Sequence, residues 1–321
     1  MIARAASWCT CWGTASTRSP LASKPVTIAS IRIDGNESGT ARLGCCVQTQ
    51  MTLKRIALLL AATMVVSACG IEDDPGLGLP EDPDAPVLQI RSEGGFAPVT
   101  MILGRGPLYT LLADGRLIYE GPTIAIYPGP LVPNYQVARI TDQQMQHVME
   151  LIESIGLPEM DQGIDESAAS RVADATTEVV TYWDGNGEHS YAVYALGIDL
   201  DEPQPPATVA FRELIDLMGE LTASEAEPYT PERVQIVAGP GTVDEEFEDV
   251  RAWPVEDADL AAWESFPNGW MCKTFGHGVL AEFTDATQAT VWEHPDPDHP
   301  NSLVTLLVRP LHPGEEPCPT S

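Results

Sequence analysis

The sequence contains few basic residues and has no long apolar run. Of its 321 residues, 17 are lysine or arginine and 47 are aspartate or glutamate, so the formal net charge is −30. We therefore exclude a nucleic-acid partner, because contact with a phosphate backbone requires a basic surface. The apolar run at residues 56–66 is about half of the roughly 20 residues that span a bilayer, which excludes a polytopic membrane protein.

Common catalytic signatures are also missing. The chain contains no G-x-S-x-G, S-x-x-K, H-E-x-x-H or P-loop sequence, and no complete G-x-G-x-x-G. Each of these motifs places a nucleophile, a pair of metal ligands or a phosphate cradle in a fixed geometry. Their absence lowers the expectation of an enzyme without removing it.

The most informative segment is a predicted signal sequence at residues 51–68. Two cationic residues, Lys54 and Arg55, precede the apolar run, and small residues follow it, as in a secretory signal. Because the sequence Val66-Ser67-Ala68-Cys69 ends in cysteine, the segment resembles the lipobox signal of bacterial lipoproteins. The resemblance implies cleavage between Ala68 and Cys69 and a diacylglyceryl group on Cys69, which anchors the protein to the extracytoplasmic face of the cell membrane. The alternative is an ordinary secretory signal in which Cys69 has no role.

A signal that starts at Met51 leaves residues 1–50 in front of it. These residues carry five basic and two acidic side chains, four cysteines and no long apolar period. We interpret residues 1–50 as a wrongly assigned leader, with Met51 as the true start. A genuine basic, transit-like extension is the alternative.

The chain after the predicted cleavage site is more acidic still. From Cys69 onward, 45 acidic residues stand against ten basic ones, and Lys273 is the only lysine. Such a surface favours solubility and repels other acidic polymers. Residues 69–86 are acidic and rich in proline and glycine, so we expect them to form an extended tether.

Two cysteines remain after Cys69, namely Cys272 and Cys318. Outside the cytoplasm, a pair of this kind favours a disulfide. A zinc site with two cysteine ligands is the weaker alternative, because no histidine pair lies at zinc-finger spacing.

The hydrophobic pattern predicts an α+β fold with a sheet and a smaller second unit. Residues 87–221 are expected to form an antiparallel sheet of hairpins with two helices on one face. A linker at 222–232 then leads to a smaller, disulfide-stapled α+β unit at 233–321. In that unit we expect strands at 233–238, 250–254, 271–283 and 303–310, and a short helix near 257–264.

Turn and cap residues define the elements of the first unit. Asp114 and Gly115 predict a two-residue turn in a hairpin over 108–120, which would pair Thr110 with Tyr119. A second hairpin is expected over 178–196. Thr141 and Gln144 predict a capping box at the start of a helix that ends at Gly156. A second amphipathic helix is expected to follow the prolines at 203–206 and to end near Leu221.

One further resemblance covers roughly residues 87–221. Pro107-Leu108-Tyr109-Thr110-Leu111, the Asp114-Gly115 turn and Tyr119-Glu120-Gly121 precede a capped helix. This arrangement is similar to small extracytoplasmic domains of unknown function in bacterial lipoproteins. The resemblance implies a location and a fold, and it carries no catalytic residues.

The best candidate metal ligands are His294, Asp296, Asp298 and His299, with His277 and His312 as further histidines. Two imidazoles and two carboxylates suit zinc or a harder cation such as calcium. On this reading, His294, Asp298 and His299 would serve a metal-dependent surface hydrolase. The alternative is a structural loop, because the prolines in the segment hold it extended and separate its side chains.

Acidic runs and aromatic residues offer weaker candidates. The run Asp244–Asp249 suits low-affinity calcium binding and calcium-dependent adhesion, although such runs are usually solvated loops. Several aromatic side chains suit either a glycan or peptide groove or ordinary cross-strand packing. These are Tyr109, Tyr119, Tyr127, Tyr135, Trp183, Tyr191 and Tyr194.

Taken together, the sequence predicts a lipid-anchored extracytoplasmic protein with a non-catalytic binding or scaffold role. We expect the membrane as one partner, through the diacylglyceryl group, and a protein or a glycan as the other. No cofactor is expected. A metal-dependent hydrolase and a calcium-dependent adhesin are the alternatives.

Overall fold

The computed structural model describes residues 79–160, 162–198, 203–223, 225–296, 298–299 and 302–318. All of them belong to one compact unit, Cys69–Ser321. They form an α+β fold with two mixed sheets, which confirms the α+β class that the sequence predicts. The leader, the signal with its cleavage site, Cys69 and most of the tether lie outside the described residues.

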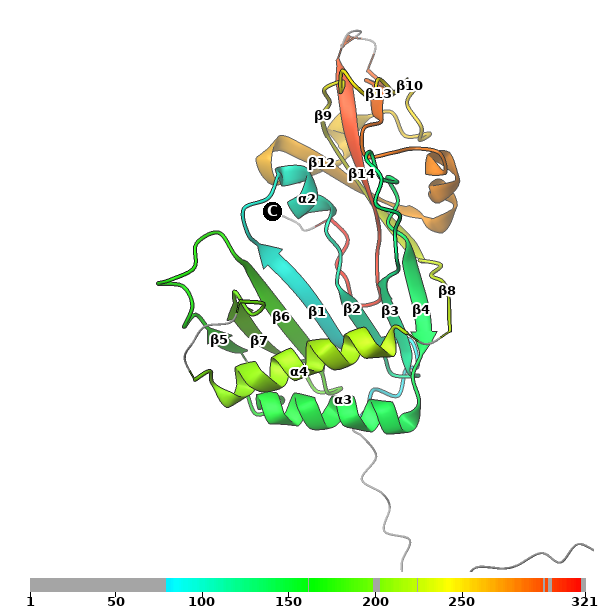
Figure 1. Cartoon of the computed structure of the whole chain (residues 1–321). Coiled ribbons are helices and arrows are strands. Elements are labelled where there is room, and N and C mark those ends of the chain that lie inside the picture. Colours follow the sequence, from blue (N-terminus) through cyan, green and yellow to red (C-terminus); the bar gives the residue numbers. More distant parts are fainter. Residues whose placement is uncertain are drawn as a thin grey trace, which may run out of the picture. The chain divides into compact units, whose positions relative to one another are not determined.

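The first sheet has eight strands in the order β5-β7-β6-β1-β2-β3-β4-β8 (Figure 1). The strands are β1 (Pro86–Gly94), β2 (Tyr109–Leu112), β3 (Arg116–Glu120), β4 (Tyr135–Arg139), β5 (Gln162–Asp165), β6 (Thr176–Trp183), β7 (Glu188–Tyr194) and β8 (Ala226–Pro228). β5 runs parallel to β7, whereas all other neighbours are antiparallel. The prediction of a wholly antiparallel sheet is wrong here, because the connection 166–175 carries the chain past β7 to β6. β8, which pairs with β4, falls within the residues expected to form a linker.

Three helices accompany these strands, namely α2 (Val99–Gly104), α3 (Asp142–Ile155) and α4 (Pro206–Leu221). The predicted capping box of α3 is confirmed. The Thr141 side chain accepts a hydrogen bond from the backbone N–H of Gln144, whose side chain in turn accepts one from the Thr141 backbone. Gly156, with a left-handed φ of 101°, ends this helix.

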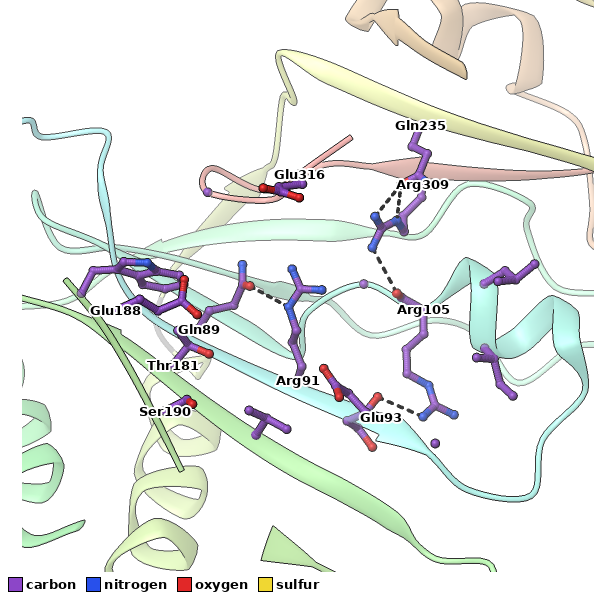
Figure 2. A pocket seen from close by; sticks show the side chains of 18 of the residues that line it. Gln89, Arg91, Glu93, Arg105, Thr181, Glu188, Ser190, Gln235, Arg309 and Glu316 are labelled. Atoms are coloured by element: carbon purple, nitrogen blue, oxygen red, sulfur yellow. Dashed lines mark hydrogen bonds between the residues drawn. The ribbon is translucent and has the colours of Figure 1, made fainter. Parts of the chain in front are cut away.

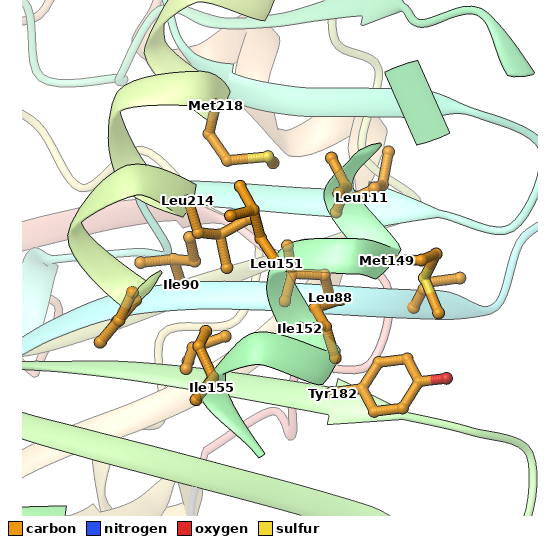
Figure 3. Close-up of a cluster of buried hydrophobic side chains, with 14 of the residues drawn as sticks. Leu88, Ile90, Leu111, Met149, Leu151, Ile152, Ile155, Tyr182, Leu214 and Met218 are labelled. Atoms are coloured by element: carbon orange, nitrogen blue, oxygen red, sulfur yellow. The ribbon is translucent and has the colours of Figure 1, made fainter. Parts of the chain in front are cut away.

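The largest core forms where α3 and α4 pack against the strands (Figure 3). Leu88 and Ile90 of β1 contribute to it together with Ile152 of α3 and Leu214 of α4. Since side chains alternate between the two faces of a strand, Gln89 and the next polar residues of β1 must face away from this core. That second face of the sheet is where the candidate site lies.

The turn between β2 and β3 differs from the prediction. Its pairs are Tyr109 with Tyr119 and Leu111 with Leu117, one residue out of the expected register. Gly115 has a φ of 82° and its N–H binds the Leu112 carbonyl, while Asp114 keeps a negative φ. The chain therefore forms a longer turn that ends in a left-handed glycine, which shifts the register relative to a two-residue turn.

The second sheet has six strands in the order β10-β13-β14-β9-β12-β11. They are β9 (Arg233–Pro240), β10 (Val250–Arg251), β11 (Glu264–Phe266), β12 (Trp270–Gly276), β13 (Val291–Glu293) and β14 (Leu303–Pro310). β10 and β13 are parallel and the other pairs are antiparallel.

Three predicted elements of this sheet are shorter than expected. The predicted strand 271–283 ends at Gly276, and His277–Phe283 forms a 3₁₀ helix that buries Phe283 against Trp292. The predicted strand 250–254 is only two residues long, Val250–Arg251. The predicted short helix near 257–264 is a 3₁₀ turn at Leu260–Ala262.

Cys272 and Cys318 form a disulfide, which confirms the predicted pairing. The bond ties β12 to the segment that follows β14. Both cysteines are buried in a small cluster with Val237 and Trp270, against which Val99 and Leu103 of α2 pack. No helix within the described ranges is both long and apolar enough to cross a membrane.

Candidate ligand-binding cleft

A cleft lies between the polar face of the first sheet and the second sheet. Alternation along β1 directs Gln89 and Arg91 to this side, opposite Leu88 and Ile90. The same rule places Thr181 and Trp183 of β6 and Ser190 of β7 along its wall, since their neighbours Val180, Tyr182 and Tyr191 are in the core. The wall is therefore a row of polar side chains with one indole.

The opposite wall comes from the second sheet and from the residue after α2. Arg309 of β14 and Gln235 of β9 lie on the face that turns away from the core of the second sheet. Arg105 follows α2 directly, and Ile102, Leu103 and Phe266 add apolar side chains to the lining. The cavity has a volume of about 560 Å³, within the range of small-molecule sites. We call it the arginine cleft after Arg91, Arg105 and Arg309.

Hydrogen bonds hold the three arginines in place (Figure 2). Arg309 donates to the Gln235 side chain and, through Nη1, to the backbone carbonyl of Arg105 at 3.3 Å. Arg91 Nε donates to Gln89 Oε1 at 2.7 Å. Arg105 Nη1 donates to the carbonyl of Ser92 at 3.1 Å. The cleft is thus preorganised, because the side chains that line it are fixed by their own neighbours.

One buried carboxylate, Glu315, joins the two walls. Its Oε1 accepts from Arg91 Nη2 at 3.1 Å and from Arg309 Nη1 at 3.0 Å. Its Oε2 accepts from the backbone N–H of His312 at 2.7 Å. The Glu315 side chain is only 1% exposed. A fully buried carboxylate requires this many charge-assisted partners to offset the loss of hydration.

His312 extends this buried network away from the cleft. Its Nδ1 lies 2.8 Å from Thr110 Oγ1, which accepts from Gln89 Nε2 at 3.1 Å. The contacts from Gln89 to Thr110 and from Thr110 to His312 thus link β1 and β2 to the segment after β14. Burial, assisted by Arg309 and Arg91, lowers the pKa of His312 to about 3. The imidazole is therefore neutral near pH 7.

The charge of the cleft differs from that of the chain as a whole. Three guanidinium groups and four carboxylates, those of Glu93, Glu188, Glu315 and Glu316, lie in or beside the cleft. Glu315 is buried between Arg91 and Arg309, whereas Glu93, Glu188 and Glu316 are exposed, and among the described residues no ion pair joins these three glutamates to the arginines of the cleft. Since only ten basic residues follow Cys69, three arginines around one cavity are a marked local concentration of positive charge.

The candidate metal ligands lie in a different part of the second sheet. His294, Asp296 and His299 border a cavity of about 1060 Å³ with many apolar lining residues. The two imidazole rings lie 4.8 Å apart, and His299 Nδ1 lies 3.2 Å from Asp296 Oδ2. Asp298 is exposed and contacts Asp296 through its backbone N–H. Among the described residues, no three histidine, cysteine, aspartate or glutamate side chains are placed to hold a metal ion.

The other two histidines do not join this group. His277 is exposed in a 3₁₀ helix, and His312 belongs to the buried network.

The acidic run Asp244–Asp249 is partly engaged with other side chains. Asp249 pairs with Arg251 at 2.9 Å and accepts from Thr290 Oγ1 at 2.6 Å. The hydrogen bond from Arg251 lowers the pKa of Asp249. Asp244 accepts from the Tyr127 hydroxyl at 3.3 Å. Two of the carboxylates expected to collect calcium therefore have partners within the protein.

The aromatic residues considered for a groove are dispersed. Trp183 lines the arginine cleft, whereas Tyr109 and Tyr119 line a small cavity of about 360 Å³ beside α4. The remaining rings pack elsewhere: Tyr127 on Phe247, Tyr135 on His312 and Tyr191 on Phe211. Tyr194 donates through its hydroxyl to the carbonyl of Val172.

Sequence reasoning missed the residues that build the arginine cleft. Gln89 and Arg91 alternate with Leu88 and Ile90, a pattern that is read as the solvent face of a half-buried strand. One available signal was that arginine is scarce after Cys69, and that Arg91, Arg105 and Arg309 all lie in or next to predicted strands.

Comparison of the chain with known protein families, curated proteins and solved structures finds no match.

Proposed function

We propose that this protein is anchored by a lipid on Cys69 to the extracytoplasmic face of the cell membrane and binds a ligand in the arginine cleft without catalysing a reaction. The observation that carries the proposal is the grouping of three scarce arginines around one preorganised cavity of about 560 Å³. Small-molecule sites are typically concave surfaces with a few well-placed polar groups.

The chemistry of the inner cleft favours binding over catalysis. Guanidinium, amide and hydroxyl groups keep their protonation state near neutral pH, so they orient a ligand without exchanging protons with it. Arg91 and Arg309 are further fixed by Glu315. A rigid set of donors of this kind lowers the entropic cost of binding.

In this proposal the first sheet is a platform. α3 and α4 pack against one of its faces, the opposite face is left for the ligand, and the second sheet supplies the second wall. The acidic tether would hold this platform away from the membrane, and the partner outside the cell would be a glycan or a protein that presents a small charged group.

The anchor is tested through Cys69. Cys69→Ser should abolish labelling by a fatty-acid analogue and release the protein from membranes, because two acyl chains are needed for stable anchoring. Labelling that persists in this variant would refute the lipid anchor.

The cleft is tested by filling it. Thermal unfolding of the full chain should be measured against a panel of sugars, carboxylates, phosphates and amines. Ser190→Trp places an indole in the cleft, so ligands that raise the melting temperature of the natural protein should lose that effect. Ser154→Trp, on the exposed side of α3, is the matched control. Ligands that stabilise the Ser190→Trp variant as strongly as the natural protein would place the site elsewhere.

A metal-dependent hydrolase built on His294, Asp298 and His299 is the second candidate. The 4.8 Å separation of the two imidazole rings beside a large cavity favours it. It requires a stoichiometric transition metal in the purified protein that is lost in a His294→Ala, His299→Ala double variant.

A further inference from the structure

We propose that the ligand of the arginine cleft is an acidic saccharide, with its carboxylate held by Arg91 and Arg105 and its ring against Trp183. This inference rests on the proposed function, since it names the ligand of the same cleft. Its support comes from the charge of the cleft, the free donors of two arginines and the composition of the wall.

Two guanidinium groups of the cleft are accessible to an anionic group. Glu315 shares its Oε1 between Arg91 and Arg309, whereas the only side-chain hydrogen bond of Arg105 among the described residues goes to a neutral backbone carbonyl. The guanidinium of Arg309 is largely buried, with its side chain 10% exposed, whereas the Arg91 side chain is 33% exposed. The guanidinium groups that a ligand can reach are therefore those of Arg91 and of the partly exposed Arg105.

Arg91 and Arg105 also have donors to offer. A guanidinium carries five N–H groups. Within the described chain, Arg91 uses Nε for Gln89 and Nη2 for Glu315, and Arg105 uses Nη1 for the carbonyl of Ser92. Nη1 of Arg91 and Nε and Nη2 of Arg105 remain for a ligand. Planar carboxylates are the acceptors that match guanidinium groups best.

The rim excludes a densely charged ligand. Glu93, Glu188 and Glu316 are exposed side chains of the cleft lining, and the whole chain carries a net charge of −30. A polyphosphate or another polyanion would be repelled there. A ligand with a single carboxylate and an otherwise neutral, hydroxyl-rich body avoids this repulsion, and its hydroxyls can donate to the rim carboxylates.

The wall formed by β6 and β7 suits such a body. Trp183 offers an indole against which the apolar C–H face of a sugar ring packs, and Thr181 and Ser190 place hydroxyls beside it. An aromatic surface flanked by hydrogen-bonding groups satisfies both the apolar and the polar parts of a saccharide. The cavity of about 560 Å³ accommodates one or two sugar rings.

The experiment uses the full lipidated chain in detergent and isothermal titration calorimetry with D-glucuronate and D-glucose. These probes share a ring and differ mainly in the carboxylate. We expect D-glucuronate to bind at least tenfold more tightly than D-glucose, with an affinity that falls as sodium chloride is raised. Arg105→Gln should remove this preference, and Trp183→Ala should weaken both probes. Arg139→Gln, at an arginine on β4 that does not line the cleft, is the matched control.

Equal affinities for the two probes, or no binding of D-glucuronate, would overturn the acidic-saccharide assignment. Circular dichroism and thermal unfolding of Arg105→Gln and Trp183→Ala ensure that lost binding is not lost folding. The proposed function fails separately. If the Ser190→Trp variant still blocks stabilisation by other members of the ligand panel, the cleft is a binding site and only the saccharide assignment is wrong.

Discussion

At the scale of single residues, the buried Glu315 connects the two sheets, although no sequence pattern singled it out. It bonds to Arg91 of the first sheet, to Arg309 of the second and to the backbone N–H of His312. Because its carboxylate is fully buried, the ionised form is stable only while these cationic and N–H partners surround it. Removing its charge leaves Arg309 buried without a counter-ion.

We therefore expect Glu315→Gln to lower the free energy of unfolding by about 3 kcal/mol, as when one partner of a buried ion pair is removed. Urea unfolding followed by tryptophan fluorescence measures the change. Glu316→Gln removes the same charge from the exposed neighbour and should change stability by no more than about 0.5 kcal/mol. Similar effects of the two substitutions would show that burial of Glu315 does not matter.

His312 makes a second residue-scale prediction, on pH. Its pKa is about 3 in the folded protein, below the ordinary 6.5, because burial disfavours the charged imidazolium. Between these pH values His312 is protonated in the unfolded chain and neutral in the folded chain. The stability that depends on neutral His312 is therefore complete above about pH 6.5 and is lost as the pH falls toward 3.

The measurement is urea unfolding at pH 7 and pH 4.5. The natural protein should lose about 2–3 kcal/mol more between these pH values than His312→Gln, at about 1.4 kcal/mol per pH unit. The other titrating groups are common to both proteins, so the difference isolates His312. A His312→Gln variant that shows the same pH dependence as the natural protein would contradict the buried, neutral imidazole.

The roles of these residues could not be read from the sequence. Glu315 and Glu316 are adjacent and chemically alike, yet one is buried and the other exposed, because only the folded path of the segment after β14 decides which side chain meets Arg91. From the sequence, His312 is a further candidate beside His294 and His299. Its hydrogen-bond partner, Thr110, lies 202 residues earlier.

At the scale of elements, local signals predicted the structure better. The cap of α3 was predictable because a Thr and a Gln three residues apart satisfy each other's backbone within one helical turn. The turn after β2 was predicted one residue out of register, because the choice between a two-residue turn and a longer one depends on whether Asp114 takes a positive φ. That choice is settled by pairing across the sheet.

The disulfide supports an element-scale prediction. Cys272–Cys318 closes a loop with a sequence separation of 46 and fixes β12 to the segment that carries Glu315. Replacing both cysteines with serine should lower the free energy of unfolding by about 4 kcal/mol, from the entropy that the unfolded chain regains. Thermal unfolding with and without dithiothreitol measures this. The reductant should destabilise the natural protein and leave the double variant unchanged, and a double variant as stable as the natural protein would contradict the expected role.

At the scale of the whole molecule, the excess of acidic residues opposes the compact state. A net charge of −30 concentrated by folding creates mutual repulsion among carboxylates. Salt screens this repulsion, since the Debye length falls from about 30 Å at 0.01 M to about 3 Å at 1 M. The arginine cleft lies inside this negative field, so an anionic ligand meets attraction only at short range.

We therefore expect the melting temperature to rise steadily as sodium chloride is raised from 0.01 M to 0.5 M. The same experiment distinguishes screening from a specific cation site. If the acidic run Asp244–Asp249 only repels its neighbours, calcium chloride and sodium chloride at equal ionic strength should raise the melting temperature by similar amounts. Calcium-dependent adhesion requires instead a saturable extra rise with calcium, because a ligand that binds only the folded state stabilises it by mass action. That extra rise with calcium should disappear in an Asp244→Asn, Glu246→Gln, Glu248→Gln variant. Separately, a melting temperature of the natural protein that falls with added sodium chloride would show that attraction between charges, and not repulsion, dominates this surface.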